Sequence, residues 1–518
     1  MKKTLSAVFL PWLLGVAVLL SACGKDYEVP KEWVPDDYMP DESGRYGVRW
    51  SIYDVDNLGE RCFTAAGKRA KIGIGRTNGS SDFDKIFPWS EIRRCNITTA
   101  GGTERVVLEG EAGFALDGSN GDVFVRIPKF GYERYVKDGY EYRVITRDGK
   151  PHPAFVEDGK EVDAVYVGAF EAFKDADGLH SKADVIPTAD ITPKAFLELA
   201  QQRGSRYTLY DLRTVDMIFS LFAVEYGCRN SGVVLGYGCS QYKQPMEMKH
   251  EGNNWYYQTT SVHATNCFTG RYVAENKMSE GSNILICKGS QETVLTYARL
   301  MRVEADRGAD ETRYYFDGQP LDLTTDCFIG SCAQSTNWCE TCSEPLAWHT
   351  GRAGMRDAFD ERMRNPMRYR WIENVVGNLW HYLPDVTFVN NQMYACANMK
   401  DYAMHCSEGA YQPVGPELPY NAELGLQIDK PGYNYWVTSL MYVADAPAMS
   451  FGQTFDSQIF SYKAFGAFHY LREGRNILAN GGGFDHEFRS NILTNRAWIY
   501  PDKQWYLYGA RLMYKPIE

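Results

Sequence analysis

Beyond its first 22 residues, the chain has neither a long hydrophobic run nor an excess of basic residues. No later stretch approaches the roughly 18 apolar residues from which a membrane-spanning helix is recognised. The formal net charge is −11, from 55 Lys and Arg against 66 Asp and Glu. Nucleic-acid binding requires a basic footprint. The composition therefore excludes nucleic acid as an expected partner.

The chain also lacks the signatures of several enzyme classes. It has no G-x-S-x-G elbow for a serine nucleophile, and its nine His include no H-x3-H pair. Two loops, Asp117–Asp122 and Asp175–Gly178, offer oxygen ligands for Ca²⁺, but neither has the EF-hand spacing with its terminal Glu. Tight turns of Asp, Asn and Gly explain both loops. We favour that interpretation over a calcium site and expect no cofactor.

Residues 1–22 form a targeting segment, with a basic start and an apolar stretch over Ala7–Leu20. The following Leu20–Cys23 resembles a bacterial lipobox, in which the peptidase cuts before a Cys that becomes lipidated. The alternative is an ordinary secretory signal. Lys25–Glu28 resembles the surface-export signals of Bacteroidota lipoproteins. We therefore expect an outer-membrane lipoprotein that is attached to the membrane through Cys23 and exposed on the cell surface.

Residues 23–44 follow as an acidic tether. They carry Pro30, Pro35 and Pro40 among acidic side chains and little apolar sequence. Loss of Lys2 and Lys3 with the signal moves the formal charge from −11 to −13. Such a segment cannot bury much apolar surface, so we expect it to be extended.

The chain has 13 Cys, and setting Cys23 aside leaves an even number for an oxidising compartment. Spacing predicts four local disulfides: Cys62–Cys95, Cys228–Cys239, Cys267–Cys287 and Cys396–Cys406. A late cluster comprises Cys327, Cys332, Cys339 and Cys342. Four thiols this close could bind structural zinc. We favour two disulfides of undetermined pairing.

Two segments have helical periodicity, 193–203 and 212–226. Asp211 or Thr214 could cap the second helix at its start, and Gly227 is a suitable residue to end it.

Alternating residues predict strands at Val48–Tyr53 and Val123–Ile127, inside a β-rich region at 45–135. Further strand-like runs are Thr293–Glu304 and Trp505–Met513. No internal repeat is present.

Arg368–Tyr382 contains two Trp, two Tyr and a Gly-Asn pair. Its E-N-x-x-G-N-x-W run resembles the E-N-x-W-G-N-x-W element of the C-type-lectin-like fold found in formylglycine-generating enzymes. The resemblance implies that the motif residues form the structural heart of the fold: Glu373, Asn374, Gly377, Asn378 and Trp380.

Other segments resemble phage-tail-associated and gut-bacterial receptor-binding proteins of this fold. They include Phe83–Asn96, Asn120–Phe130 and the closing Gly509–Leu512, in one consistent order. The resemblance implies an α+β chain with a C-type-lectin-like domain at 136–518. Residues 228–345 would then be long insertion loops stapled by disulfides.

In the receptor-binding members, the ligand surface is formed by the final strands and loops, which here correspond to Gly481–Tyr508. We expect Trp498 and Tyr500 to share one strand face, exposed or in the core, because strand side chains alternate. Trp505 and Tyr508 suit the core. The candidate ligand-binding residues are Phe484, His486, Phe488, Arg489, Arg496, Trp498 and Tyr500.

These observations predict a surface-anchored adhesin or receptor-binding lipoprotein that recognises a protein or glycan. One alternative is an extracytoplasmic formylglycine-generating enzyme, which would need a copper-binding cysteine pair. Cys396 and Cys406 fit a disulfide better. A structural phage-tail-like or appendage component is a further alternative. Ligand identity and oligomeric state stay open at this point.

Overall fold

A computed structural model describes the chain from residue 43 to 517, with gaps. The predicted signal peptide, most of the tether and Cys23, the expected lipidation site, lie outside the described residues. The gaps are 55–56, 71–79, 101–102, 241–256, 259–261, 272–279, 282, 289–292, 305–310, 324–326, 342–364, 391, 405–408, 416–419, 422–425, 428–433, 442–450, 456–467, 472–473 and 485–489.

The protein is mostly β, with 15 % helix and 42 % strand in several antiparallel sheets. The predicted α+β class is therefore correct only in part, because helices are few. Within the described residues the α-helices are α2 (Pro193–Gln201), α3 (Leu212–Tyr226), α4 (Ser231–Leu235) and α5 (Trp338–Thr341). None of these is long and apolar enough to cross a membrane.

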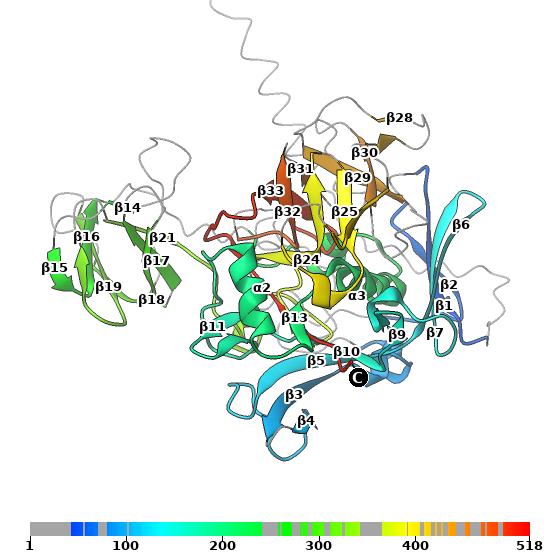
Figure 1. Ribbon diagram of the computed structural model, residues 1–518, viewed down its shortest axis with the longest axis horizontal. Coiled ribbons are helices and arrows are strands. Elements are labelled where there is room, and N and C mark those ends of the chain that lie inside the picture. Colours follow the sequence, from blue (N-terminus) through cyan, green and yellow to red (C-terminus); the bar gives the residue numbers. More distant parts are fainter. Residues whose placement is uncertain are drawn as a thin grey trace, which may run out of the picture.

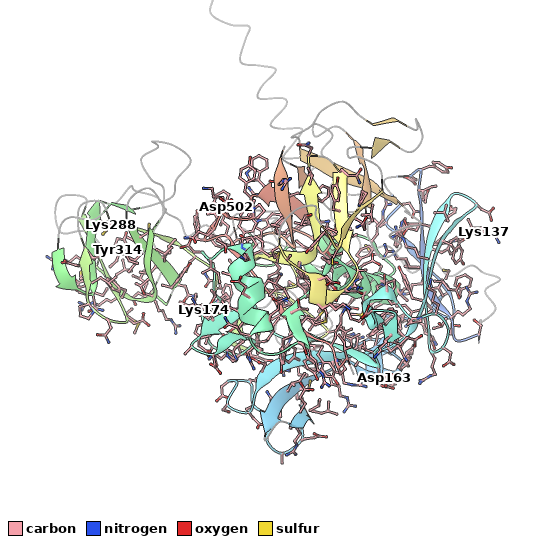
Figure 2. The ribbon with its side chains drawn as sticks, viewed as in Figure 1. Lys137, Asp163, Lys174, Lys288, Tyr314 and Asp502 are labelled. Carbon is pink, nitrogen blue, oxygen red and sulfur yellow. The ribbon has the colours of Figure 1, made fainter. Side chains whose placement is uncertain are left out.

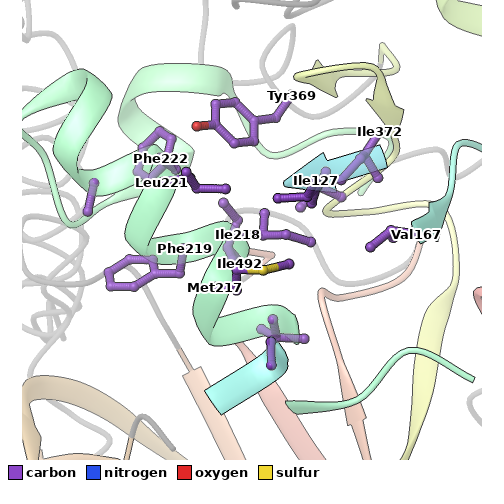
Figure 3. Packing of buried hydrophobic residues seen from close by; sticks show 14 of the residues in the cluster. Ile127, Val167, Met217, Ile218, Phe219, Leu221, Phe222, Tyr369, Ile372 and Ile492 are labelled. Atoms are coloured by element: carbon purple, nitrogen blue, oxygen red, sulfur yellow. The ribbon is translucent and has the colours of Figure 1, made fainter. Parts of the chain in front are cut away.

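Helix α3 lies at the centre of the main body, and all of its residues except Arg213 are buried. It begins where the Asp211 side chain accepts a hydrogen bond from Thr214 N, and it ends at Gly227, whose φ is +63°. The predicted bounds of this helix are confirmed. Figure 3 shows its apolar side chains against residues of distant segments, including Ile127, Val167 and Tyr369.

In the six-stranded sheet, the last strand of the chain lies between strands that come much earlier in the sequence. Met513 pairs with Val167 on one side and Thr208 on the other. The strand order is β13 (Tyr207–Leu209), β35 (Leu512–Tyr514), β10 (Ala164–Gly168), β5 (Asp122–Pro128), β3 (Arg93–Ala100) and β4 (Thr103–Leu108).

A four-stranded antiparallel sheet covers α3 on another side (Figure 1). Its order is β2 (Glu60–Phe63), β1 (Tyr46–Ser51), β7 (Tyr140–Thr146) and β6 (Gly131–Lys137). The expected boundary at 135 falls inside β6, which pairs along its whole length with β7. The β-rich segment and the rest of the main body share one hydrophobic core, which runs from Val48 to Met513.

The largest sheet is built from strands that lie between Trp380 and Gly509. Its order is β26 (Tyr411–Val414), β25 (Gln392–Cys396), β24 (Trp380–Val389), β32 (Arg475–Asn480), β33 (Asn495–Ile499), β31 (Phe468–Leu471), β29 (Asn434–Met441) and β30 (Phe451–Phe455), with β34 (Tyr508–Gly509) beside β24.

Short two-stranded pairs complete the main body: β8 (Val156–Glu157) with β9 (Lys160–Glu161), β11 (Phe173–Asp175) with β12 (Gly178–His180), β22 (Arg368–Tyr369) with β23 (Ile372–Glu373), and β27 (Tyr420–Asn421) with β28 (Leu426–Gln427).

The predicted single strand at Trp505–Met513 is wrong. Its residues divide between β34 in the largest sheet and β35 in the six-stranded sheet, because the chain crosses between the two sheets at Ala510 and Arg511. Buried Arg511 fixes this crossing by donating hydrogen bonds to Gly168 O at 2.9 Å and Glu373 O at 2.6 Å.

The region expected to be insertion loops contains a folded β unit instead, set to one side in Figure 1. Alternating apolar residues give this sheet its own core, which includes Ile284, Ile286 and Leu300. The order is β14 (Tyr257–Gln258), β21 (Cys327–Ser331), β17 (Asn283–Lys288), β18 (Thr293–Glu304), β19 (Glu311–Phe316) and β16 (Cys267–Arg271), with β15 (Val262–Thr265) paired to β20 (Leu321–Leu323).

No disulfide joins the cysteines that the structure describes, so disulfides do not staple this unit. Cys62 lies on β2 of the four-stranded sheet and Cys95 on β3 of the six-stranded sheet, and both have free thiols. Closeness in sequence predicted this pair incorrectly, because the two strands belong to different sheets.

Two further predicted pairs are also unformed. Cys228 has a free thiol that donates to Asn230 O at 3.5 Å, so it does not join Cys239. Cys267 and Cys287 lie on β16 and β17, which are not neighbours in their sheet. Spacing along the chain does not bring either pair together.

The remaining cysteines are only partly described. The Cys396 thiol donates to Asn398 O at 3.4 Å, while Cys406 and Cys342 lie outside the described residues. Cys327 packs in the core of the β unit, and Cys332 packs on its other side. These two side chains therefore face different surroundings.

Candidate functional site

The aromatic motif begins with a tight hairpin between β22 and β23. Arg370 and Trp371 form its two-residue turn, with φ values of +44° and +72°. Positive φ at both positions matches the twist of a hairpin but is costly for a Trp. Contacts hold this turn: the Arg94 guanidinium lies 4.7 Å above the Trp371 ring, and Arg370 Nε donates to Glu225 at 3.0 Å.

The motif then surrounds a buried carboxylate, Glu171. Asn374 Nδ2 donates to it at 3.2 Å, Leu379 N donates at 3.2 Å, and the Asn378 amide also bonds to it. His381 Nε2 lies 3.2 Å from the same carboxylate. Both Asn side chains, the Leu379 backbone and His381 thus point inward to Glu171 rather than to solvent.

Glu373 lies in the same interior. Its carboxylate accepts a hydrogen bond from Cys339 N at 2.8 Å, and burial raises its pKa to about 7. Trp380 and the Asn378 side chain are completely buried. Gly377 has φ +80° and pairs with Cys239, where an added Cβ would lie 2.7 Å from Cys239 N. The motif thus occupies the fold's interior.

The candidate C-terminal surface is centred on β33. Burial alternates along this strand, so Arg496 and Trp498 are half-buried on one face, and Tyr500 follows on that face at the strand's end. The Arg496 guanidinium lies 5.6 Å from the ring centres of Trp498 and Trp505. We call these the β33 row: Arg496, Trp498 and Tyr500.

The other predicted ligand residues do not join this row in the described part. Phe484 is buried, with its ring centre 6.1 Å from that of Tyr506. His486, Phe488 and Arg489 lie outside the described residues. Tyr508 is buried as expected, while Trp505 and Tyr506 are half-buried.

The acidic loops form turns and ion pairs. Asp117 accepts a hydrogen bond from Ser119 N at 2.9 Å, as a tight turn requires. Asp175, Asp177 and His180 form the one group of three metal-capable side chains within the described ranges. Lys182 Nζ lies 3.2 Å from the Asp175 carboxylate.

His180 itself is enclosed by charged partners. Arg203 Nη1 lies 2.6 Å from His180 Nδ1, and the Asp122 carboxylate lies 3.1 Å from the same atom. The hydrogen bond to Asp122 raises the pKa of His180 against the opposing effect of burial. With Lys182 on Asp175 as well, cations already occupy positions where a metal ion would sit. This cluster therefore fits an ion-pair network better than a metal site.

Sequence patterns missed a groove on the outer face of the four-stranded sheet. It has a volume of about 430 Å³ and is lined by arginines and aromatic rings from all four strands, including Arg49, Phe63 and Tyr142. The alternation along β1 and β7 could have indicated this groove. Trp50 and Arg143 point into the core, so the residues that precede them, Arg49 and Tyr142, point to the outer face of the sheet. The groove requires β2 and β6 as well, and only the tertiary structure assembles them.

Comparison with known proteins adds no assignment to these surfaces. No protein-family model matches the chain, and no curated protein matches it.

Proposed function

We propose that the protein is a surface-anchored lipoprotein that binds a protein or glycan through its C-terminal face. The β33 row supports this proposal, since it presents an Arg and two large aromatic residues together on a half-exposed strand face. Trp, Tyr and Arg are enriched among the interface residues that contribute most of the binding free energy, because they combine a large contact area with specific polar groups. Trp505 and Tyr506 extend this aromatic surface.

Binding fits the described chemistry better than catalysis. Carboxylates with strongly shifted pKa values are enclosed in interior networks, such as Asp216 between Arg143 and His152. Burial also raises the pKa of the Cys95 thiol to about 12 and that of Cys228 to about 11, and a nucleophilic or copper-binding cysteine needs a thiolate. These groups hold the fold together and do not offer a reactive centre.

A C-type-lectin-like fold remains our interpretation of the main body. Two helices, α2 and α3, precede the largest sheet, which follows a long insertion. The buried E-N-x-x-G-N-x-W motif lies where this sheet begins. An experimental structure of the mature chain, compared with a lectin-like domain, would test this interpretation.

Binding is tested by screening the mature chain without its lipid, residues 24–518, on a glycan array and on whole cells. We expect Trp498→Ala and Tyr500→Ala each to weaken the strongest interaction at least tenfold. Met301→Ala is the matched control, because its side chain is 58 % exposed on the β unit, away from this face. Unchanged binding by both β33 variants would remove the proposed surface.

The anchor is tested separately. Cells expressing the full chain should incorporate labelled palmitate into the protein, and Cys23→Ser should abolish that label. External protease should digest the protein on intact cells if it faces outward. Absence of lipid label on the wild-type chain would contradict the proposed anchor.

A further inference from the structure

The four-stranded sheet has two chemically different faces. One is packed inward and carries Val48, Trp50 and Ile145. The other carries a cross-strand row in which Tyr135 on β6 pairs with Tyr142 on β7, and Tyr142 pairs with Arg49 on β1. Arg49 in turn pairs with Glu60 on β2. This outer row forms the floor of the groove.

Aromatic rings line the groove. Tyr135 and Tyr142 stack with centroids 4.9 Å apart and planes only 11° from parallel. The Phe63 ring lies 6.2 Å from that of Tyr142. All three side chains are only partly buried. Partly exposed rings on one sheet face make a platform for a flat, weakly apolar ligand surface.

The position of Phe63 requires an unusual backbone. Its φ is +55°, which is a true outlier for a bulky residue and is energetically unfavourable. Gly47 makes room for the ring, because an added Cβ there would lie 2.7 Å from Phe63 Cδ2. Such strain is concentrated at binding sites. The fold therefore maintains Phe63 over the groove at a cost.

The groove is cationic although the chain is acidic. Arg45, Arg49 and Lys137 accompany one carboxylate, Glu60, so these side chains carry three positive charges and one negative charge, a net of +2. Arg61 also lines the groove, but its guanidinium points inward and donates to Glu225 O at the end of α3. The formal charge of the chain is −11. Glu133 pairs with Arg45 at the rim, at 2.7 Å, and counting it leaves +1. A concentrated positive field in a hollow attracts an anion.

The cations are placed beside the rings. The Arg45 guanidinium lies 4.6 Å from the Phe63 ring centre, and Arg49 Nη1 donates to the Tyr142 hydroxyl at 3.3 Å. Arg49 Nε is also 2.6 Å from Glu60. Guanidinium groups held in this way are oriented in advance for a planar anion.

We infer that this groove binds a glycan whose sugar rings carry carboxylate or sulfate groups. The apolar C–H face of a pyranose packs on Phe63 and Tyr142, while its anionic group pairs with Arg45 and Arg49. Glu60 accepts hydrogen bonds from the sugar hydroxyls, and the tyrosine hydroxyls donate to them or accept from them. The 430 Å³ volume is within the usual range for small-ligand sites, about 300–1,000 Å³, and suits one or two sugar rings.

Glu60 also explains why a phosphate-rich ligand fits less well. A carboxylate 2.6 Å from Arg49 repels a dense anion but is a good acceptor for a hydroxyl. The site is separate from the β33 row: in Figure 2, Lys137 lies at the right edge of the main body, whereas Asp502, which follows that row, lies toward its left edge.

Calorimetric titration of residues 24–518 tests the site with three probes: tetragalacturonate for carboxylate, a chondroitin sulfate tetrasaccharide for sulfate, and neutral cellotetraose. We expect at least one acidic probe to bind, and cellotetraose to bind at least tenfold more weakly. The two acidic probes identify which anion the arginines prefer. Equal binding of the neutral probe, or no binding of either acidic probe, would overturn the inference.

Variants locate the site. Arg49→Gln should weaken the acidic probe at least tenfold, whereas Arg302→Gln should stay within twofold. Arg302 is a matched control, since it lies 4.0 Å from the Tyr315 ring and 3.2 Å from Glu304 on the β unit. Lys137→Gln changes an exposed side chain and should weaken binding about threefold with a smaller salt dependence.

The same titrations control for loss of folding in the variants and for the independence of the groove from the β33 row. If Arg49→Gln fails to fold, Lys137→Gln decides the outcome, and wild-type affinity in that variant would overturn the inference. Trp498→Ala should bind the acidic probe as the wild type does, even if the C-terminal surface proves to bind nothing. A tenfold loss in Trp498→Ala would contradict a separate groove.

Discussion

At the scale of single residues, the protein places many charged groups in its interior and pairs several of them there. Glu171 collects donors from the aromatic motif, and Lys515 lies fully buried within 3.2 Å of Glu157 and 3.4 Å of Asp211. Leaving one partner of such a pair buried alone is costly, typically about 3–5 kcal/mol. These residues are thus part of the fold's stability.

Glu373 gives the stability a specific pH dependence. Burial raises its pKa to about 7, above the roughly 4.3 of an unfolded Glu. Between these values the unfolded chain has already lost the proton that the folded chain keeps, so this group lowers stability as pH rises through that window. Each unit of pKa shift corresponds to about 1.4 kcal/mol.

We therefore expect Glu373→Gln to gain thermal stability relative to the wild type as pH rises from 4.5 to 7.5. The Gln carbonyl can still accept the hydrogen bond from Cys339 N. Differential scanning fluorimetry at several pH values gives the measurement. A difference that stays constant or shrinks with rising pH would show that Glu373 is ionised in the folded protein.

The thiols permit a second test at this scale. Cys62, Cys95 and Cys228 have free thiols, and burial raises their pKa values to about 12, 12 and 11. Alkylation at pH 8 should therefore label them slowly in the native protein and completely after unfolding without reductant. Mass spectrometry assigns the labelled sites. Resistance of Cys62 and Cys95 to labelling after unfolding would restore the disulfide predicted from their spacing.

At the scale of secondary-structure elements, local sequence predicted what local physics controls. The bounds of α3 follow from Asp211 at its start and Gly227 at its end. Strand β18 spans Thr293–Glu304, as its sequence indicated. The hairpin turn at Arg370 and Trp371 was not predicted, because neither residue is typical of positive φ. Contacts with Arg94 and Glu225 hold it, and those residues are far away in sequence.

The Gly377 turn is the most sensitive point of the motif. A Cβ added there would lie 2.7 Å from Cys239 N, at a φ of +80°. We expect Gly377→Ala to lower the melting temperature by several degrees, whereas Gly409→Ala tests φ strain alone, because φ there is +74° and no atom lies within 4 Å. Equal melting temperatures for the two variants would show that the close approach to Cys239 is unimportant.

At the scale of the whole molecule, the C-terminal strand closes the fold. Met513 is fully buried and lies between β10 and β13, which precede it by more than 300 residues along the chain. The largest sheet, the six-stranded sheet and α3 are connected through this region, where Arg511 and Lys515 are also buried. The stability of the folded protein therefore depends on the pairing of β35 with β10 and β13.

Met513→Ala should accordingly destabilise the protein by about 2–5 kcal/mol, the usual range for deleting a buried methionine side chain. Met301→Ala is the matched control, because that side chain is 58 % exposed and should change stability by no more than about 0.5 kcal/mol. Denaturant unfolding followed by tryptophan fluorescence measures both. Similar losses in the two variants would contradict the central position of β35.

The sequence by itself determined the elements whose signals lie within a few residues: the caps of α3, the strands β1 and β5, and the burial-prone aromatic motif. Tertiary structure decided which strands become neighbours. It separated Cys62 from Cys95, folded the expected insertion loops into a β unit, and assembled the groove around Arg49 from four strands. The reason is that periodicity and capping act locally, whereas strand pairing depends on contacts between residues far apart in sequence.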